Sequence, residues 1–196
     1  DPTKLGTSTV HVIVKPDVVE TTSSVNGTGQ TTVSAGVNGE MGKKTIIFTP
    51  EFKNAGDKTI PDVTAKWIIS GIPDQTEQEN TIITFTTSEE NNQLSVTVDA
   101  QNSHIIEQKQ YTIAIKANTL TETLSDGDMT AATFTVNVEP DTAVKSSIVS
   151  IDRSSVNINA GENGTSGSVV SGVTASAKYY NGGYIPGTTP EEEKSE

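Results

Sequence analysis

Strict alternation of apolar and polar residues is the feature that most constrains how this chain can fold. Two runs show it, with apolar residues at Tyr111, Ile113, Ile115 and Ala117 in one and at Ala132, Phe134, Val136 and Val138 in the other. Successive side chains of a β-strand point to opposite faces, so each run predicts a half-buried strand. The loop between them, residues 118–130, contains the turn-forming sequence Ser-Asp-Gly-Asp. The two runs therefore predict an antiparallel pair of strands.

Shorter runs of the same kind recur upstream, separated by turn-forming stretches. Their apolar members are Ile46 and Phe48; Val63, Ala65, Trp67 and Ile69; Ile83 and Phe85; and Leu94, Val96 and Val98. No window has the apolar spacing of an amphipathic helix, and in residues 101–110 the apolar pair occupies adjacent positions. Short strands at regular intervals with turns between them predict an all-β protein, specifically a β-sandwich.

The charge balance and the absence of cysteine exclude several classes of protein. The chain has 13 lysine and arginine residues against 25 aspartate and glutamate residues, so its net charge of -12 provides no basic surface for nucleic acid. Without cysteine there are no disulfides, thiolate zinc sites or cysteine nucleophiles. No apolar stretch approaches the roughly 18 residues of a membrane-spanning helix. The abundance of Ser, Thr, Asn and Gly favours an extracellular or cell-surface protein, with an export signal or lipid anchor upstream.

The order of the predicted strands resembles that of immunoglobulin-like modules. In that family a tryptophan on the third strand packs in the core and a tyrosine near the start of the sixth bonds back to the preceding corner, and Trp67 and Tyr111 stand at matching places. The ending YTIAIKA…ATFTVNVEP is similar to the last two strands of immunoglobulin-like and fimbrillin-like modules in bacterial surface lipoproteins of the Bacteroidetes type. The resemblance covers residues 43–140, without the family's cysteine pair. It implies a β-sandwich at a cell surface.

The sequence predicts one full module followed by part of a second. Residues 1–140 are expected to form an immunoglobulin-like β-sandwich with additional N-terminal strands. Within them the Ser/Thr-rich residues 21–39 are either a mobile hairpin or a weakly held edge. Residues 141–187 are expected to form a second β module, which either completes the sheets of the first or lacks the segment that would finish it. Residues 188–196 are expected to be a charged, disordered tail.

Two acidic clusters are candidate metal ligands. Asp126 and Asp128 could offer carboxylate oxygens to calcium, although calcium takes six to eight oxygens and a turn is the favoured interpretation. Asp141 and Asp152 lie near the expected boundary between the modules and could add ligands there. No complete calcium-binding loop is present, so no metal site is predicted.

Aromatic and histidine residues supply the remaining candidates. Tyr179, Tyr180 and Tyr184 form the only aromatic cluster and could contact carbohydrate or protein, with burial as the favoured alternative. His11 and His104, the only histidines, stand beside no nucleophile or metal motif. The sequence therefore predicts no catalytic residue, no cofactor and no enzyme activity.

Three functions remain open at this point. The first is a non-catalytic surface protein that acts as a spacer or a binding and adhesion module, with an unknown protein or carbohydrate as partner. The second is a fimbrial or assembly subunit that donates the segment STVHVIVKP, with alternating Val10, Val12 and Val14, to the open sheet of a neighbour. The third is a β-pore-forming toxin, in which residues 21–39 would become a membrane hairpin.

Overall fold

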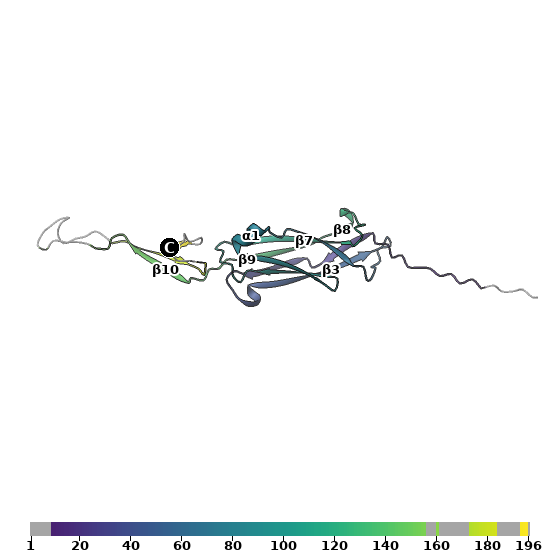
Figure 1. Cartoon of the computed structure of the whole chain (residues 1–196), viewed down its shortest axis with the longest axis horizontal. Coiled ribbons are helices and arrows are strands. Elements are labelled where there is room, and N and C mark those ends of the chain that lie inside the picture. The colour runs from purple at the N-terminus through teal and green to yellow at the C-terminus, as the bar shows by residue number, and fades with distance from the viewer. Residues whose placement is uncertain (1–8, 156–159, 161–172, 184–192, 196) are drawn as a thin grey trace, which may run out of the picture.

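Two β-sheets make up the sandwich. The computed structural model describes residues 9–155, 160, 173–183 and 193–195. The first sheet contains β1 (Thr22–Asn26), β3 (Lys43–Lys53), β5 (Thr84–Glu90), β6 (Gln93–Asp99) and β8 (Met129–Thr130), in the order β5-β6-β3-β1-β8. The second contains β2 (Gly29–Ser34), β4 (Ala65–Ser70), β7 (Lys109–Thr119) and β9 (Ala132–Glu139), in the order β2-β9-β7-β4. The two sheets lie face to face (Figure 1).

The inward residues of both sheets form one hydrophobic core, as the alternation predicts. Nearly every predicted inward position on β6, β7 and β9 is buried: Leu94, Val96, Val98, Ile113, Ile115, Ala117, Ala132, Phe134, Val136 and Val138. Tyr111, at the start of β7, is partly buried against the same core. Phe48 of β3 meets Phe134 of β9 edge to face, with ring centroids 6.2 Å apart, so this contact joins the two sheets.

The strand order identifies the sandwich as immunoglobulin-like. That fold has one sheet of strands A, B, E and D and a second of strands C, F and G. Here β1, β3, β6 and β5 take the places of the first set, and β4, β7 and β9 those of the second. After β1, the chain crosses to the second sheet as β2, which pairs in parallel with β9. The predicted fold class and the predicted antiparallel pairing of β7 with β9 are both confirmed.

The sequence predicts no helix, and this is wrong for one short segment. Residues of the stretch SGIPDQTEQEN form α1 (Gln75–Thr81), and two single 3₁₀ turns occur at η1 (Gly39–Met41) and η2 (Asp126–Asp128). Asp74 caps α1 by accepting a hydrogen bond of 2.8 Å from the Glu77 backbone amide. Because α1 is seven residues long, its few apolar positions cannot show a helical period, and only the cap could have signalled it.

The Ser/Thr-rich residues 21–39 do not pair with one another as a hairpin, and their second strand, β2, is an edge strand of its sheet. They supply β1 to one sheet and β2 to the other, and Val25 and Val33 are buried in the core. β1 and β2 belong to different sheets in this structure. The pore-forming hypothesis, in which residues 21–39 would rearrange in a membrane, stays a prediction.

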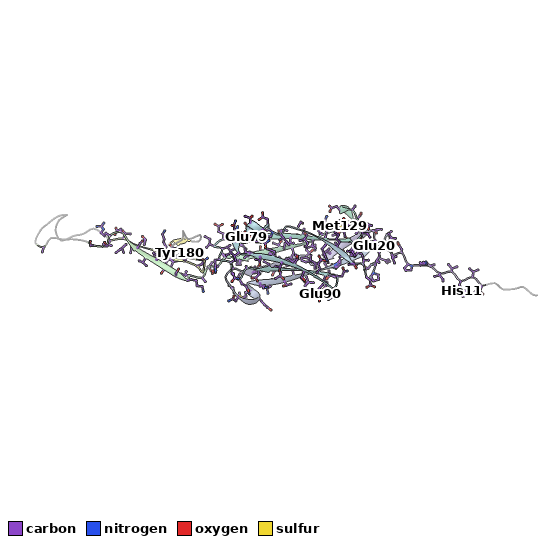
Figure 2. All side chains as sticks on the ribbon, in the orientation of Figure 1. His11, Glu20, Glu79, Glu90, Met129 and Tyr180 are labelled. Atoms are coloured by element: carbon purple, nitrogen blue, oxygen red, sulfur yellow. The ribbon has the colours of Figure 1, made fainter. Side chains whose placement is uncertain are left out.

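The predicted strand at Val10, Val12 and Val14 does not form. Residues 9–21 are outside any strand, and the three valines are 79%, 80% and 85% exposed. This segment runs away from the sandwich at the end opposite β10 (Figure 1), and in Figure 2 His11 and Tyr180 lie on opposite sides of the sandwich. The alternation is therefore present, but within the described part of the chain the segment has no neighbouring strand to pair with.

A small sheet follows the sandwich in the chain. It contains β10 (Ser146–Ile151), β11 (Ala175–Tyr180) and β12 (Glu193–Ser195), with both pairings antiparallel. On β10, Val149 and Ile151 are more than half exposed. Glu193–Ser195 pair with β11, a difference from the disordered tail that the charges lead us to expect, whereas residues 188–192 lie outside the described residues. The two-module division itself stays a prediction.

Core burial in β6 makes a first test. Leu94 is fully buried, whereas Ile47 on the neighbouring strand β3 is 55% exposed. We expect Leu94→Ala to lower the free energy of unfolding by about 2–5 kcal/mol, because it removes buried contacts and leaves a cavity. Ile47→Ala, the matched control, should change it by less than about 0.5 kcal/mol. Urea unfolding followed by tryptophan fluorescence measures both, and equal losses would contradict this assignment of inward and outward faces.

Candidate functional site

A buried polar site lies where the sandwich meets the small sheet. His104 stands in the loop between β6 and β7, Asp141 follows β9, and Asn181 follows β11. We call these three residues the joint. The Nδ1 atom of His104 lies 2.8 Å from Oδ2 of Asp141 in a hydrogen bond. The amide of Asn181 donates to the His104 carbonyl at 2.8 Å and to the Asp141 carbonyl at 3.2 Å.

The polar groups of Asp141 and Asn181 are buried, which makes the loss of their hydrogen bonds costly in free energy. Asp141 is 5% exposed and Asn181 is 3% exposed, so each polar group would lose much if its partner moved away. The Asp141 backbone amide donates to the Ile105 carbonyl at 2.8 Å, which holds the chain after β9 against the loop of His104. The joint therefore links three elements that are far apart in sequence.

Three glycines allow the close approach of backbone at the joint. Gly36 has a φ of +71°, and a Cβ atom there would come within 2.7 Å of the Asp141 carboxylate. Cβ atoms at Gly182 and Gly183 would come within 2.6 Å and 2.9 Å of His104. Any side chain at Gly36 would face both backbone strain and a steric clash. Glycine at these positions lets the two parts of the chain touch.

The electrostatics of Asp141 favour its charged form. Burial, the largest influence, raises the pKa of Asp141. Hydrogen bonds from His104, Ala143 and Gly182, together with the charge of His104, outweigh it and lower the pKa below the ordinary value of 3.8. The carboxylate is thus held by donors on both sides of the joint, since His104 belongs to the sandwich and Gly182 follows β11.

The candidate calcium ligands are engaged in contacts within the protein. Asp126 accepts a hydrogen bond from the Lys116 ammonium at 2.7 Å, and Asp128 accepts one from the Ser125 hydroxyl at 2.7 Å. Among the described residues, no group of three or more histidine or acidic side chains is placed to hold a metal ion. Asp152 lies at the far end of β10 beside Arg153 rather than near Asp141.

The tyrosine cluster does not form one exposed surface in the described residues. Tyr180 is buried and Tyr179 is half-buried, and both belong to β11. Tyr184 lies outside the described residues. A role of Tyr179 in binding carbohydrate or protein stays a prediction.

The two aromatic residues that carry the family resemblance are partly buried against the core. Trp67, on β4, packs there as the resemblance implies. The Tyr111 hydroxyl donates to the Glu77 carboxylate of α1 at 3.2 Å instead of bonding back to the corner before it. Burial, opposed by the hydrogen bond with Thr81 and reinforced by the charge of Glu77, raises the pKa of Tyr111 to about 12. Its hydroxyl therefore stays protonated and anchors α1.

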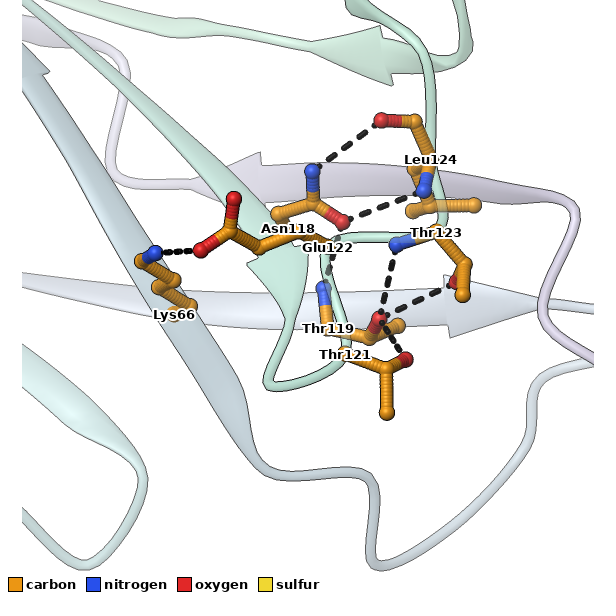
Figure 3. A network of polar contacts seen from close by, with 7 residues as sticks. All are labelled: Lys66, Asn118, Thr119, Thr121, Glu122, Thr123 and Leu124. Carbon is orange, nitrogen blue, oxygen red and sulfur yellow. Dashed lines mark hydrogen bonds and ion pairs between the residues drawn. The ribbon is translucent and has the colours of Figure 1, made fainter.

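The opposite end of the sandwich carries a second polar network (Figure 3). The Asn118 side chain accepts from the amides of Thr119 and Leu124 at 2.8 Å and 3.2 Å, and it donates to the Leu124 carbonyl at 3.0 Å. Lys66 forms an ion pair with Glu122 of the same loop. These contacts fix the loop between β7 and β8, at the end where residues 9–20 leave the sandwich.

Comparisons with known proteins find neighbours of low sequence identity among solved structures. Neither the family models nor the curated proteins that were searched match this chain. Among solved structures, a chimeric titin Z1Z2 aligns at 13% identity and a TM-score of 0.35, over 62% of this chain and 98% of its own. The surface layer protein SbsC, domains 4–9, aligns at 19% identity and 0.37, over 87% and 21%. The GspB Siglec domain aligns at 12% and 0.33, over 70% and 64%.

Sequence reasoning missed the joint. In the sequence His104 stands beside no nucleophile or metal motif, Asp141 is a candidate only for calcium, and Asn181 belongs to no candidate site. Three polar residues at widely separated positions form no local motif, so periodicity could not reveal them. The available signal was the Asn-Gly-Gly sequence at residues 181–183, since glycine pairs permit close backbone contact.

Removing the Asn181 amide should loosen the joint without affecting the sandwich. Asn181→Ala leaves the carbonyls of His104 and Asp141 without this donor, which should weaken docking of the small sheet by about 1–3 kcal/mol. Backbone ¹⁵N relaxation should then show β10 and β11 moving independently of the sandwich, while the urea midpoint of the sandwich stays unchanged. Ser176→Ala, an exposed position on β11, is the control. Unchanged relaxation in Asn181→Ala would show that the joint does not hold the two parts together.

The lowered pKa of Asp141 predicts how the joint responds to acid. A carboxylate whose folded pKa lies below its unfolded value contributes stability that is full above that value and is lost as the pH falls through the folded pKa. The joint should therefore stay closed above pH 3.8 and open as the pH is lowered below it. Relaxation measured from pH 6 down to pH 2.5 follows the opening. Asp141→Asn has no proton to gain at this position, so the same acid transition in that variant would contradict the assignment to Asp141.

Proposed function

We propose that this chain is a non-catalytic part of an exported surface protein, in which β-sandwich modules act as rigid spacers. The observation that carries the proposal is the joint. Only residues 140–145 separate β9 from β10, and this short link is secured on both sides by His104 and Asn181. A flexible tether needs no buried polar contacts. A spacer that holds its two ends at a defined distance does.

The positions of the two histidines support a structural role. His104 is committed to Asp141 within the joint, and His11 stands in the exposed N-terminal segment. Each titratable group singled out for its burial also serves a contact between elements, with Tyr111 fixing α1 and Asp141 fixing the joint. Tyr111 and Asp141 are therefore engaged in structural hydrogen bonds, which would compete with proton transfer to a substrate.

The surface location rests on composition and on the family resemblance. A net charge of -12 suits a protein that must stay soluble at a cell surface. No helix in the part of the chain that the structure describes is both long and apolar enough to span a membrane. Attachment through an upstream lipid anchor belongs to the same proposal. A partner protein or carbohydrate would then be met by loops and strand edges.

A distance measured between the sandwich and the small sheet, across the joint, tests the spacer role. The chain has no cysteine, so Ser88→Cys on β5 and Ser176→Cys on β11 provide site-specific spin labels at exposed positions. Pulsed electron resonance should give one narrow distance distribution. The same pair of labels in a His104→Ala, Asn181→Ala background should give a broad one. A broad distribution in the otherwise native chain would exclude a rigid spacer.

A further inference from the structure

The start of the sandwich and the start of the small sheet share a sequence. The segment KPDVVETTSSV, residues 15–25, aligns without gaps with EPDTAVKSSIV, residues 139–149. Further along, VSAGVNG at residues 33–39 aligns with INAGENG at residues 158–164, and KNAG at residues 53–56 aligns with YNGG at residues 180–183. The order of the three matches is the same in both parts. These matches indicate an internal repeat.

Hydrogen bonds show that the first and third matches are also matches in structure. The Asn54 amide donates to the Asp17 carbonyl at 3.1 Å, and the Asn181 amide donates to the Asp141 carbonyl at 3.2 Å. Each asparagine also accepts from the backbone amide two residues later, Gly56 at 3.0 Å and Gly183 at 2.9 Å.

The aspartates and the first strands follow the same rule. Asp17 accepts from the Val19 amide at 3.2 Å, as Asp141 accepts from the Ala143 amide at 3.0 Å. The Thr21 amide donates to the Lys53 carbonyl at 2.8 Å. The Lys145 amide donates to the Tyr180 carbonyl at the same distance. Asp17 and Asn54 thus have the local geometry of Asp141 and Asn181.

The two sets differ in burial. Asp141 and Asn181 are buried because the His104 loop of the sandwich covers them. Asp17 is exposed and Asn54 is half-exposed. The two sites are alike in sequence and in hydrogen bonds, but the first has no loop upon it in the described part of the chain. Asp17 and Asn54 therefore correspond to Asp141 and Asn181 of the joint, without a counterpart of His104 in the described part of the chain.

The segment before Asp17 repeats the last strand of the sandwich. VHVIVKPD, residues 10–17, aligns without gaps with FTVNVEPD, residues 134–141. Val10, Val12 and Val14 take the places of Phe134, Val136 and Val138, which are at most 9% exposed within β9. The first three are each at least 79% exposed. Residues 10–14 therefore have the sequence of an inward-facing strand, but in the described part of the chain no sandwich lies beside them.

We propose that the end of the sandwich formed by Asp17, Asn54 and the loop at residues 119–124 docks onto a further β-sandwich module of this chain's own kind, whose last strand is residues 9–14. This end is called the N-terminal pole below. The inference deepens the proposed spacer function, on which it rests, by naming the partner of the exposed end. A loop equivalent to that of His104 would donate to the Asp17 carboxylate and accept from Asn54.

The N-terminal pole has the chemistry and the rigidity for such a contact. Val18 and Leu120 are 59% and 66% exposed there, and with Glu20 they line a hollow of about 400 Å³. Asp17 and Glu20 make the pole acidic, which complements a histidine donor. The loop of Leu120 is held by Asn118 in the network of Figure 3, so little order would have to be gained on docking.

One difference between the two halves predicts a detail of the fit. Ala55 stands where Gly182 stands, and a Cβ atom at Gly182 would come within 2.6 Å of the His104 ring. A module that presents histidine to the N-terminal pole must therefore shift its ring away from Ala55. Ala55→Gly should relieve this contact and tighten docking of any module that carries His104 itself.

Two fusions test the strand and the docking separately. In the first, a copy of residues 17–132 is placed directly before Thr9, so that residues 9–16 take the place of residues 133–140 in the added module. Backbone amides of residues 10–14 should become protected from hydrogen exchange by about 100-fold or more relative to the original chain. Val12→Lys should abolish this protection, whereas Ile13→Lys, on the opposite face, should leave it. The strand assignment would be overturned if the amides of residues 10–14 are not protected in the fusion, or if Val12→Lys leaves their protection unchanged.

The second fusion keeps the native strand and tests docking alone. A copy of residues 17–140 is placed directly before Asp17, and a spin label at Ser88→Cys is introduced in each copy. The docking surface predicts a narrow distance distribution between the two labels. In the second copy, Ala55→Gly should make that distribution narrower, and Asp17→Ala together with Asn54→Ala should make it broader. A broad distribution that none of these changes alters would overturn the docking surface.

Two further results separate this inference from its alternatives. Protection of residues 10–14 in the original chain that rises with protein concentration would show that a second copy takes the strand, as in strand donation, and would overturn the inference. A narrow distribution between Ser88→Cys and Ser176→Cys in the original chain, together with failure of both fusions, would leave the spacer function standing and remove only the proposed docking partner.

Discussion

Strand β9 is the element on which the rest of the structure depends. It pairs along its length with β2 in parallel and with β7 in antiparallel orientation, so it joins the beginning of the module to its end. Phe134, Val136 and Val138 face the core from it, and the chain leaves it directly into Asp141. Burial of alternate side chains thus sets the position of the strand, and the strand sets the position of the joint. An error of one residue in register would turn the valines outward and move Asp141 away from His104.

The joint is a polar contact in a protein whose stability otherwise comes from apolar packing. Burying the Asp141 carboxylate costs free energy, and the hydrogen bonds from His104 and from backbone amides offset that cost. Such a contact adds less to stability than an apolar one of the same size, but its geometry is specific. Apolar contact alone would let the small sheet pivot on the end of the sandwich. Directed hydrogen bonds to Asn181 and Asp141 favour one orientation, which is what a spacer requires.

Much of the sandwich could be predicted from alternation, and the exceptions have physical causes. The strands β6, β7 and β9 were identified because one face of each is buried and the other is not. Helix α1 was missed because its only strong signal is the cap from Asp74 to Glu77. Val10, Val12 and Val14 show that alternation reports what a strand would bury, not whether a neighbouring strand is there. The joint could not be found by spacing, because His104, Asp141 and Asn181 meet only after three separate turns of the chain are in place.

The central claim is that the joint fixes the small sheet on the sandwich in one orientation. Residual dipolar couplings of backbone amides, measured in one weakly aligned sample of the chain, test it most directly. The account predicts that couplings from β1–β9 and from β10–β11 fit a single alignment tensor of the same magnitude and direction. Tensors that differ in magnitude between the two parts would show independent motion and would contradict the account.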